Sequence, residues 1–386
     1  MAELRQNTWT LDQWYDQDVA GNVSYSGSSS MFVAGWDQAA GLAQNVSTNL
    51  KYSSPVQIPG TTWKQIRFPR QYDNAGGMKS DGSIWSWGNG DDGSAGTNDD
   101  VTYSSPIQIL AGSGSVGGYS LDARNGIAQK SDGTIWSWGK GSEGANGQNN
   151  RTSYSSPMQI GTGEDWSKVV SAGYRHMGAV KTDGTLWVWG KNSDGILGLN
   201  QADGARVSSP TQIPGTWSTS EGGYGGGYYF SLGIKNDGTL WAWGSNTNGR
   251  LGQNDETKQS SPVQIPGDTW SYVAATQEAA HAVKTDGTLW VWGNNTNGQL
   301  GLNNRTKYSS PVQVGSGTDW SKVWNSENSA AALKTDGTLW AMGNNESGQF
   351  MNNSTAVEKY SSPTQIPGTY QWASFSNYRS GAIQEL

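Results

Sequence analysis

The sequence repeats itself with a period of about fifty residues, and this repetition constrains the fold more than any other feature. An Asp-Gly pair and a downstream Ser-Ser-Pro triplet recur together along the chain. The pairs begin at Asp81, Asp132, Asp183, Asp237, Asp286 and Asp336. The triplets end at Pro55, Pro106, Pro157, Pro210, Pro262, Pro311 and Pro363, so successive prolines are 51, 51, 53, 52, 49 and 52 residues apart. A fixed period of this length is typical of solenoids and propellers built from one repeated unit.

One repeat reads as four short β-strands. Around Asp286-Gly287, apolar residues alternate on both sides of the pair, which favours a β-hairpin with a type I′ turn. Trp290 and Trp292 then point to the same side of a β-rich segment. Residues 294–301 are rich in turn formers, and 309–314 read as an edge strand. One such sheet cannot bury both of its faces, whereas radially stacked copies can, so the sequence predicts an all-β propeller.

The two ends of the chain complete each other. Residues 28–60 form a partial repeat in which the segment 31–35 takes the place of Leu-Trp-x-Trp-Gly. At the other end, residues 372–384 match 166–181, the half of the repeat that the N-terminal part lacks. The C-terminal strands are therefore expected to complete the blade begun by the N-terminal strands, which closes the ring and removes exposed sheet edges. With six complete units, this predicts seven blades within a domain of residues 27–386.

The run Trp-x-Trp-Gly-x-Asn-x-x-Gly-Gln-Leu-Gly over residues 290–301, nearly repeated over 241–252, resembles the repeat of the RCC1 (regulator of chromosome condensation) family. The resemblance covers about residues 28–386 and weakens over 85–96 and over 340–350, where Met342 replaces the second tryptophan. It implies a seven-bladed β-propeller. The family includes a nucleotide exchange factor for a small GTPase that uses an inserted wedge, and this chain has no comparable insertion, so exchange activity is not expected.

Residues 1–26 lie outside the repeats and are expected to form an N-terminal arm. Residues 10–13 have the spacing of a capping box, and a short amphipathic helix is predicted over 11–20. Its apolar side chains are Leu11, Trp14, Tyr15 and Val19. A helix of this length is unstable alone, so its apolar face must dock. It either folds back onto its own propeller or inserts into a partner.

Candidate contacts on the propeller face come from the resemblance and from one unusual segment. RCC1 repeats often carry a histidine shortly before the small residue of the second strand, and His176 matches it. The glycine-rich segment 221–229 reads either as a binding loop or as an irregular strand entry. The candidates are Asn74, Asn125, His176, Phe230, Arg379, Tyr224 and Tyr228. The alternative is that the aligned residues are ordinary strand ends.

The composition argues against several classes of chemistry. There are 2 histidines and 0 cysteines, so neither a catalytic triad nor a His or Cys metal site is indicated. Asp91-Asp92 lies in a loop that lacks the terminal glutamate of a calcium loop. We therefore expect no enzyme activity and no cofactor. A net charge of −7 disfavours nucleic-acid binding. No long apolar run predicts a membrane span, and no signal peptide is recognisable.

Residues 4–17 also resemble the opening of propeller proteins encoded by marine tailed phages. Taken together, these features favour a non-catalytic structural propeller of the virion, such as a tail, fibre or decoration protein. The arm would dock it onto other virion proteins, and the propeller would face solvent or a host receptor. Two alternatives stay open. One is a cytoplasmic adaptor that binds a protein partner, and the other is a glycan-binding module that uses Trp and Tyr as stacking platforms.

Overall fold

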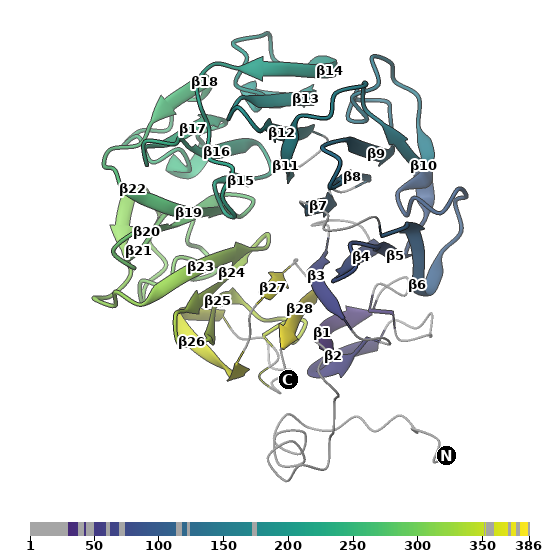
Figure 1. Ribbon diagram of the computed structural model, residues 1–386. Helices are drawn as coiled ribbons and strands as arrows, with labels where there is room; N and C mark the ends of the chain where they lie inside the picture. The colour runs from purple at the N-terminus through teal and green to yellow at the C-terminus, as the bar shows by residue number, and fades with distance from the viewer. Residues whose placement is uncertain are drawn as a thin grey trace, which may run out of the picture.

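The computed structural model shows an all-β ring of blades (Figure 1). It describes residues 30–37, 42–43, 50–58, 62–68, 74–112, 118–121, 124–171, 176–350, 352, 359–369, 372–375 and 379–384. These residues form seven four-stranded antiparallel sheets. Six are blades of consecutive strands, and a further closing sheet joins the two ends of the chain. In each blade the first strand lies toward the centre of the ring and the fourth lies at the rim.

The six consecutive blades have the following strands. Blade 1 contains β3 (Trp63–Arg67), β4 (Asn74–Lys79), β5 (Ile84–Gly88) and β6 (Tyr103–Leu110). Blade 2 contains β7 (Gly118–Leu121), β8 (Asn125–Gln129), β9 (Ile135–Gly139) and β10 (Tyr154–Gln159). Blade 3 contains β11 (Trp166–Ser171), β12 (His176–Lys181), β13 (Leu186–Asn192) and β14 (Ala205–Ile213).

Blade 4 contains β15 (Tyr224–Gly226), β16 (Phe230–Ile234), β17 (Leu240–Gly244) and β18 (Gln259–Gln264). Blade 5 contains β19 (Trp270–Ala275), β20 (Ala279–Lys284), β21 (Leu289–Gly293) and β22 (Tyr308–Gln313). Blade 6 contains β23 (Trp320–Asn325), β24 (Ser329–Lys334), β25 (Thr338–Asn344) and β26 (Lys359–Thr369). The described helical elements are the single 3₁₀ turns η2 (Asp91–Gly93), η3 (Ser193–Gly195) and η4 (Thr247–Gly249), in the loops after the third strands.

The closing sheet combines strands from both ends of the chain. Its order is β2 (Leu50–Gln57), β1 (Ser30–Asp37), β28 (Arg379–Gln384) and β27 (Trp372–Phe375). Within it, Met31 pairs with Ile383 and Val33 pairs with Gly381. Phe32 and Ala34 stand where the other blades have the two tryptophans, and both are buried, at 6% and 0% exposed. The closure predicted from the two partial repeats is therefore present.

The Asp-Gly turn differs in type from the prediction. Only the glycine of the pair has a positive φ, +78° at Gly287, whereas a type I′ turn needs positive φ at both residues. The Gly287 N–H donates to the Lys284 carbonyl (2.9 Å), which gives a type I turn followed by a left-handed glycine. The Asp286 carboxylate accepts from the Thr288 hydroxyl (2.7 Å), and that hydroxyl accepts from Trp290 Nε1 (2.8 Å). Asp, Thr and Trp thus recur together because their side chains form one chain of hydrogen bonds.

The second tryptophan of each Trp-x-Trp-Gly run joins neighbouring blades. Trp292 of blade 5 is fully buried, and its Nε1 donates to the Arg250 carbonyl in the loop of blade 4 (2.9 Å). A Cβ at Gly252 of that loop would lie 3.1 Å from the same nitrogen, so the loop needs glycine there. Equivalent bonds link Trp138 to Ser94, Trp189 to Ala145 and Trp243 to Ile196. The distant Trp-x-Trp-Gly and Gly-x-x-Gly motifs are therefore two halves of one contact between blades.

The Ser-Ser-Pro triplet supplies a second contact between blades. Asn303 of blade 5 has a positive φ of +56°, and its N–H donates to the Ser361 carbonyl of blade 6 (2.6 Å). Its side-chain oxygen accepts from the Ser362 hydroxyl (3.2 Å). The same side-chain bond joins Asn149 to Ser209, Asn200 to Ser260 and Asn254 to Ser310. The triplets recur nearly unchanged because each one is held by the preceding blade.

Candidate functional site

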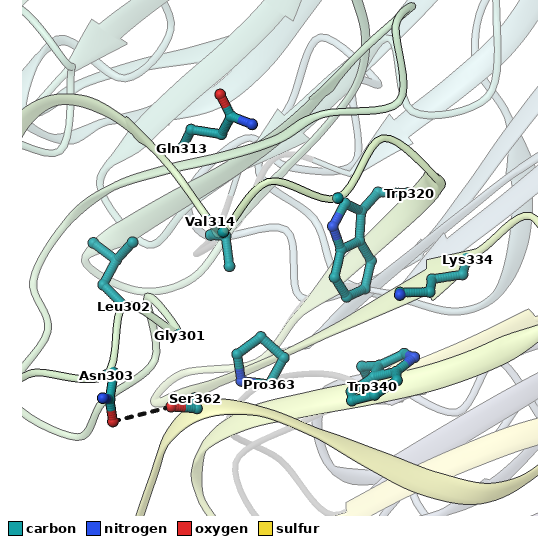
Figure 2. Close-up of a pocket in the computed structure, with 12 residues that line it drawn as sticks. Gly301, Leu302, Asn303, Gln313, Val314, Trp320, Lys334, Trp340, Ser362 and Pro363 are labelled. Carbon is teal, nitrogen blue, oxygen red and sulfur yellow. Dashed lines mark hydrogen bonds between the residues drawn. The ribbon is translucent and has the colours of Figure 1, made fainter.

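A groove of about 560 Å³ lies between blade 5 and blade 6 (Figure 2). Blade 5 contributes Leu302 from the loop after β21 and Val314 just after β22. Blade 6 contributes Trp320 at the start of β23, Trp340 in β25 and Pro363 in β26. The remaining polar side chains at the groove are Asn303, Gln313, Lys334 and Ser362. The groove therefore combines aromatic and aliphatic walls with a few amide and hydroxyl groups, as ligand sites in proteins do.

The aromatic side of the groove is held rigidly. The rings of Trp320 and Trp340 meet edge to face, with their centroids 6.3 Å apart. Lys334 Nζ lies 5.0 Å from each ring centroid and 3.1 Å from a carboxylate oxygen of Asp319. Similar Lys and Trp sets occur in other blades, for example Lys284 against Trp270 and Trp290. This arrangement therefore recurs in several blades, and it does not by itself explain the groove.

Three residues of blade 5 line the groove in a combination that no other copy has. Leu302 stands where blades 2 and 4 have a glutamine whose Nε2 bonds to the carbonyl of Gln159 (2.9 Å) or Gln264 (3.0 Å) in the same blade. Val314 stands where the other copies have isoleucine, namely Ile58, Ile109, Ile160, Ile213, Ile265 and Ile366. Gly315 stands where four copies have proline, and a Cβ built on it would meet nothing within 4 Å. Leu302 cannot form the bond that glutamine forms within its blade, and Val314 and Gly315 are smaller than isoleucine and proline.

Most candidates predicted on the propeller face are buried, so that prediction was wrong for them. Asn74, Asn125, His176 and Phe230 each begin the second strand of their blade, and each side chain is at most 2% exposed. The loop after the third strand covers this position, as the bond from Asn125 Nδ2 to Asn146 Oδ1 (2.9 Å) shows. These side chains therefore pack and bond inside the blade, as the strand-end alternative holds.

The remaining candidates lie in different surroundings. Tyr224 is partly buried in β15, with its ring 5.9 Å from that of Trp243, and Tyr228 is 7% exposed against Tyr229. Both tyrosines therefore serve packing. Arg379 begins β28 and pairs through its backbone with Gly35. The predicted arm residues, Leu11, Trp14, Tyr15 and Val19, lie outside the described residues.

The acidic pair in the first loop takes part in contacts between blades. Asp92 accepts from Lys140 Nζ of blade 2 (3.2 Å) and is also ion-paired with Arg124. Across the described residues, no three His, Cys, Asp or Glu side chains gather closely enough to hold a metal ion. In the same part of the chain, no helix has the length and hydropathy needed to cross a membrane.

His281 gives the propeller a predictable sensitivity to acid. Its side chain is fully buried in β20, and Nε2–H donates to the Gln299 carbonyl (2.8 Å). Burial lowers the pKa of His281 to about 4. In the unfolded chain His281 binds a proton near pH 6.5, whereas in the native state it does so only near pH 4. The free energy of unfolding therefore falls as the pH drops from about 6.5 to 4. The loss from this residue is expected to be about 3 kcal/mol.

The matched variant is His281→Leu, because Leu232 holds the same position in blade 4. Urea denaturation at pH 7 and pH 4 measures the drop in the free energy of unfolding between the two pH values. This drop should be about 3 kcal/mol smaller in the variant than in the wild type. The bond to Gln299 is lost at both pH values, so it cancels in the comparison. Equal losses in the two proteins would contradict a neutral buried His281.

Known proteins match the repeats. The family model described as the regulator of chromosome condensation (RCC1) repeat matches residues 132–180, 183–220, 237–278 and 286–331. Each of the four matched segments begins at the aspartate of an Asp-Gly pair, namely Asp132, Asp183, Asp237 and Asp286. A second RCC1-repeat model matches residues 168–196. These models therefore recognise the same unit that the periodicity defines.

Similar proteins of known sequence or structure point the same way. The mitochondrial RCC1 domain-containing protein RUG3 of Arabidopsis thaliana is 29% identical over 203 residues, which cover 49% of this chain and 44% of RUG3. The ultraviolet-B receptor UVR8 of Arabidopsis thaliana is 28% identical over 247 residues, 63% of this chain and 55% of UVR8. The chain thus spans about half the length of these curated relatives.

The crystal structure of Prp20p from Saccharomyces cerevisiae superimposes with a TM-score of 0.82 at 15% identity, over 94% of this chain and 93% of Prp20p. At this identity the likeness concerns the fold alone. The matched repeats, the periodicity and the ring of antiparallel sheets agree with one another. The chain belongs to the RCC1-repeat family of β-propellers.

Proposed function

We propose that this protein is a non-catalytic interaction propeller that binds a protein partner, and that the groove between blades 5 and 6 receives an extended peptide segment of that partner. The observation that carries the proposal is the combination of Leu302, Val314 and Gly315, which lines the groove and which no other copy has. Leu199 and Gly161 hold two of these positions in blades 3 and 2, but both of those copies have isoleucine in place of Val314.

The chemistry of the groove favours an uncharged segment with proline or small apolar residues. Trp340 and Pro363 are partly exposed and form apolar surfaces, and aromatic-lined grooves accept the preformed extended helix of proline-rich peptides. The ammonium group of Lys334 is paired with Asp319, which leaves little net charge at the site. Gln313 and the backbone beside Gly315 and Gly317 offer hydrogen bonds to peptide carbonyl and amide groups.

Relatives are consistent with an interaction role and do not support a virion role. Prp20p is described by its binding to Gsp1p and histones, so one propeller of this fold binds proteins. Neither the family models nor the relatives named above support the phage interpretation, and the arm on which it depends lies outside the described residues. The adaptor alternative therefore replaces it. Glycan binding is less favoured because Trp320 is only 6% exposed and offers no open stacking face.

The test compares the wild type with a variant whose groove is filled. Leu302→Gln combined with Val314→Ile restores the residues of other copies. The new glutamine should bond to the Gln313 carbonyl of the same blade, as Gln148 bonds to Gln159 and Gln253 to Gln264. A displayed library of random and proline-rich peptides is selected on the wild type, and the enriched peptides are titrated calorimetrically. We expect the filled variant to bind at least about tenfold more weakly, the effect of losing one well-packed contact.

Leu199→Gln is the matched control, since it makes the same change in blade 3 away from the groove. It should leave peptide affinity unchanged. A library that yields no peptide preferring the wild type over the filled variant would overturn the proposal. Oligosaccharides that bind the wild type and not the filled variant would instead establish the groove as a glycan site.

A further inference from the structure

A cluster of charged and phenolic side chains occupies the centre of the ring, and it is independent of the groove. Each of the six consecutive blades, or the link leading into it, contributes one residue. We call this set the axial cluster: Arg67, Tyr119, Lys168, Glu221, Tyr272 and Lys322. Figure 1 shows that β3, β7, β11, β15, β19 and β23, which carry or adjoin these residues, surround the axis of the ring.

The glycine-rich segment brings the carboxylate into this cluster. Glu221 precedes Gly222, whose φ is +75° and where a Cβ would lie 2.3 Å from the Tyr272 ring. Farther along, a Cβ at Gly225 would lie 3.0 Å from Ala274 Cα. The glycines therefore let this segment pack closely against β19, and that packing places Glu221 beside blades 5 and 6. An irregular strand entry accounts for the glycines of this segment. It does not account for the Glu221 carboxylate and the Ser220 carbonyl, which contact Lys322 and Lys168.

The contacts of the cluster cross from blade to blade. Glu221 Oε2 accepts from Lys322 Nζ (2.9 Å), and the Lys168 ammonium donates to the Ser220 carbonyl. Glu221 also interacts electrostatically with Arg67, and Arg67 interacts with both Tyr119 and Tyr272. Three cations thus share one carboxylate within the cluster. The protein as a whole carries −7, so this concentration of positive charge runs against its overall balance.

Burial shifts the pKa values of several groups in the cluster. Burial lowers the pKa of Lys168 to about 8; Glu221 raises it and Arg67 lowers it. Burial also lowers the pKa of Arg67. Burial raises the pKa of Tyr119 and of Tyr272, so both phenols keep their protons and can donate hydrogen bonds. The side chains of Lys322 and Glu221 are 30% and 44% exposed, so solvent reaches the cluster.

We propose that the axial cluster binds a phosphate-type oxyanion, with Arg67, Lys168 and Lys322 as charged donors and Tyr272 as a neutral donor. A phosphate monoester carries about −1.5 to −2 at pH 7, so three cations close together offer it complementary charge. Guanidinium and ammonium groups form short, charge-assisted hydrogen bonds with phosphate oxygens. Glu221 competes with the oxyanion for these donors, since it already accepts from Lys322.

The experiment titrates full-length protein with sodium phosphate in a calorimeter at pH 7, with sodium chloride at matched ionic strength as the reference. Lys168→Met and Lys322→Met are each expected to weaken phosphate binding about tenfold or more, because each removes a charge-assisted hydrogen bond. Lys307→Met is the control. Lys307 is paired with Glu256 at the rim and is 57% exposed, so this variant should bind as the wild type does.

The direction in which Glu221→Gln changes the phosphate affinity separates a phosphate site from a structural ion-pair network. Removing the competing carboxylate should tighten phosphate binding several-fold. A misfolded variant would not bind phosphate more tightly, so loss of structure cannot produce this result. If the cluster were only a structural ion-pair network, Glu221→Gln would lower the melting temperature without any gain in phosphate affinity, and the proposal would fail. It would also fail if phosphate gave no more heat than chloride, or if Lys307→Met weakened binding as much as Lys168→Met.

Two arms distinguish the source of the phosphate group. A phosphoserine peptide and its unphosphorylated form are titrated beside inorganic phosphate. Tighter binding of the phosphopeptide than of phosphate indicates a modified protein partner. Tighter binding of inorganic phosphate indicates a small phosphorylated molecule. Equal binding of the phosphorylated and unphosphorylated peptides would count against a phosphate site. Because the groove residues are untouched in these variants, failure here leaves the proposed peptide binding unaffected.

Discussion

Replacing Trp292 with alanine is expected to lower the free energy of unfolding by about 3–5 kcal/mol, the usual cost of truncating a large buried aromatic side chain. Trp292 is fully buried, lies edge to face with Trp270 at 6.3 Å, and donates from Nε1 to Arg250 of the preceding blade. The substitution leaves a cavity and an unsatisfied carbonyl at a join between blades. Urea denaturation followed by circular dichroism measures the loss.

The chain itself supplies the control for this substitution. Met342 occupies the same position in blade 6, where it packs beside Gly301 with no indole nitrogen to donate. Trp292→Met should therefore lose only part of what Trp292→Ala loses, since methionine fills an irregular space better than alanine. If the methionine variant were as unstable as the alanine variant, the indole hydrogen bond would matter more than the packing. If alanine cost less than about 1 kcal/mol, the assigned role of Trp292 would be wrong.

Replacing Gly287 with alanine is the second large effect. Gly287 has a φ of +78°, and an added Cβ would lie 2.0 Å from the carbonyl oxygen of Thr318 at the entry to blade 6. Alanine therefore meets both backbone strain and a clash with main-chain atoms that cannot rotate away. Together we expect a loss of about 2–6 kcal/mol, from a left-handed non-glycine residue and from overpacking.

Gly238 separates these two costs. It holds the same turn position with a φ of +80°, but its added Cβ would lie 3.4 Å from the nearest atom, the backbone nitrogen of Thr269. Gly238→Ala should therefore show the conformational strain alone, about 1–3 kcal/mol. Thermal and urea unfolding of both variants gives the difference. Equal losses would mean that the approach of Thr318 does not constrain the turn.

The fold could be predicted from the sequence because the repeat carries local information in every copy. The Asp-Gly hairpin, the paired tryptophans and the partial repeats at the ends each restrict the backbone, and they agree on one architecture. Even the replacement of the two tryptophans by Phe32 and Ala34 does not hide the closing sheet, because spacing identifies the strand. The type of the Asp-Gly turn was missed, since Asp-Gly suits both type I′ turns and longer loops that end in a left-handed glycine.

The candidate site was harder to predict because it depends on contacts between copies. Nothing in one repeat shows that Leu302 faces Pro363 of the next blade, although the combination of Leu302, Val314 and Gly315, which no other copy has, is visible in the sequence. The sequence also does not show that the loop after the third strand covers strand-start residues such as Asn125. The axial cluster draws one residue from each of six blades, so no local pattern reveals it.

The closing sheet ties the final shape of the protein to the order of its synthesis. Strand β1 leaves the ribosome more than three hundred residues before its partner β28, yet the two are hydrogen-bonded neighbours. Until β28 has been made, β1 and β2 expose an unpaired edge that can recruit a strand from another chain. Blades 1 to 6 can form one after another as they emerge, whereas the ring can close only after translation has passed β28. A nascent chain of this protein therefore needs shielding at β1 and β2 while all six consecutive blades are being made.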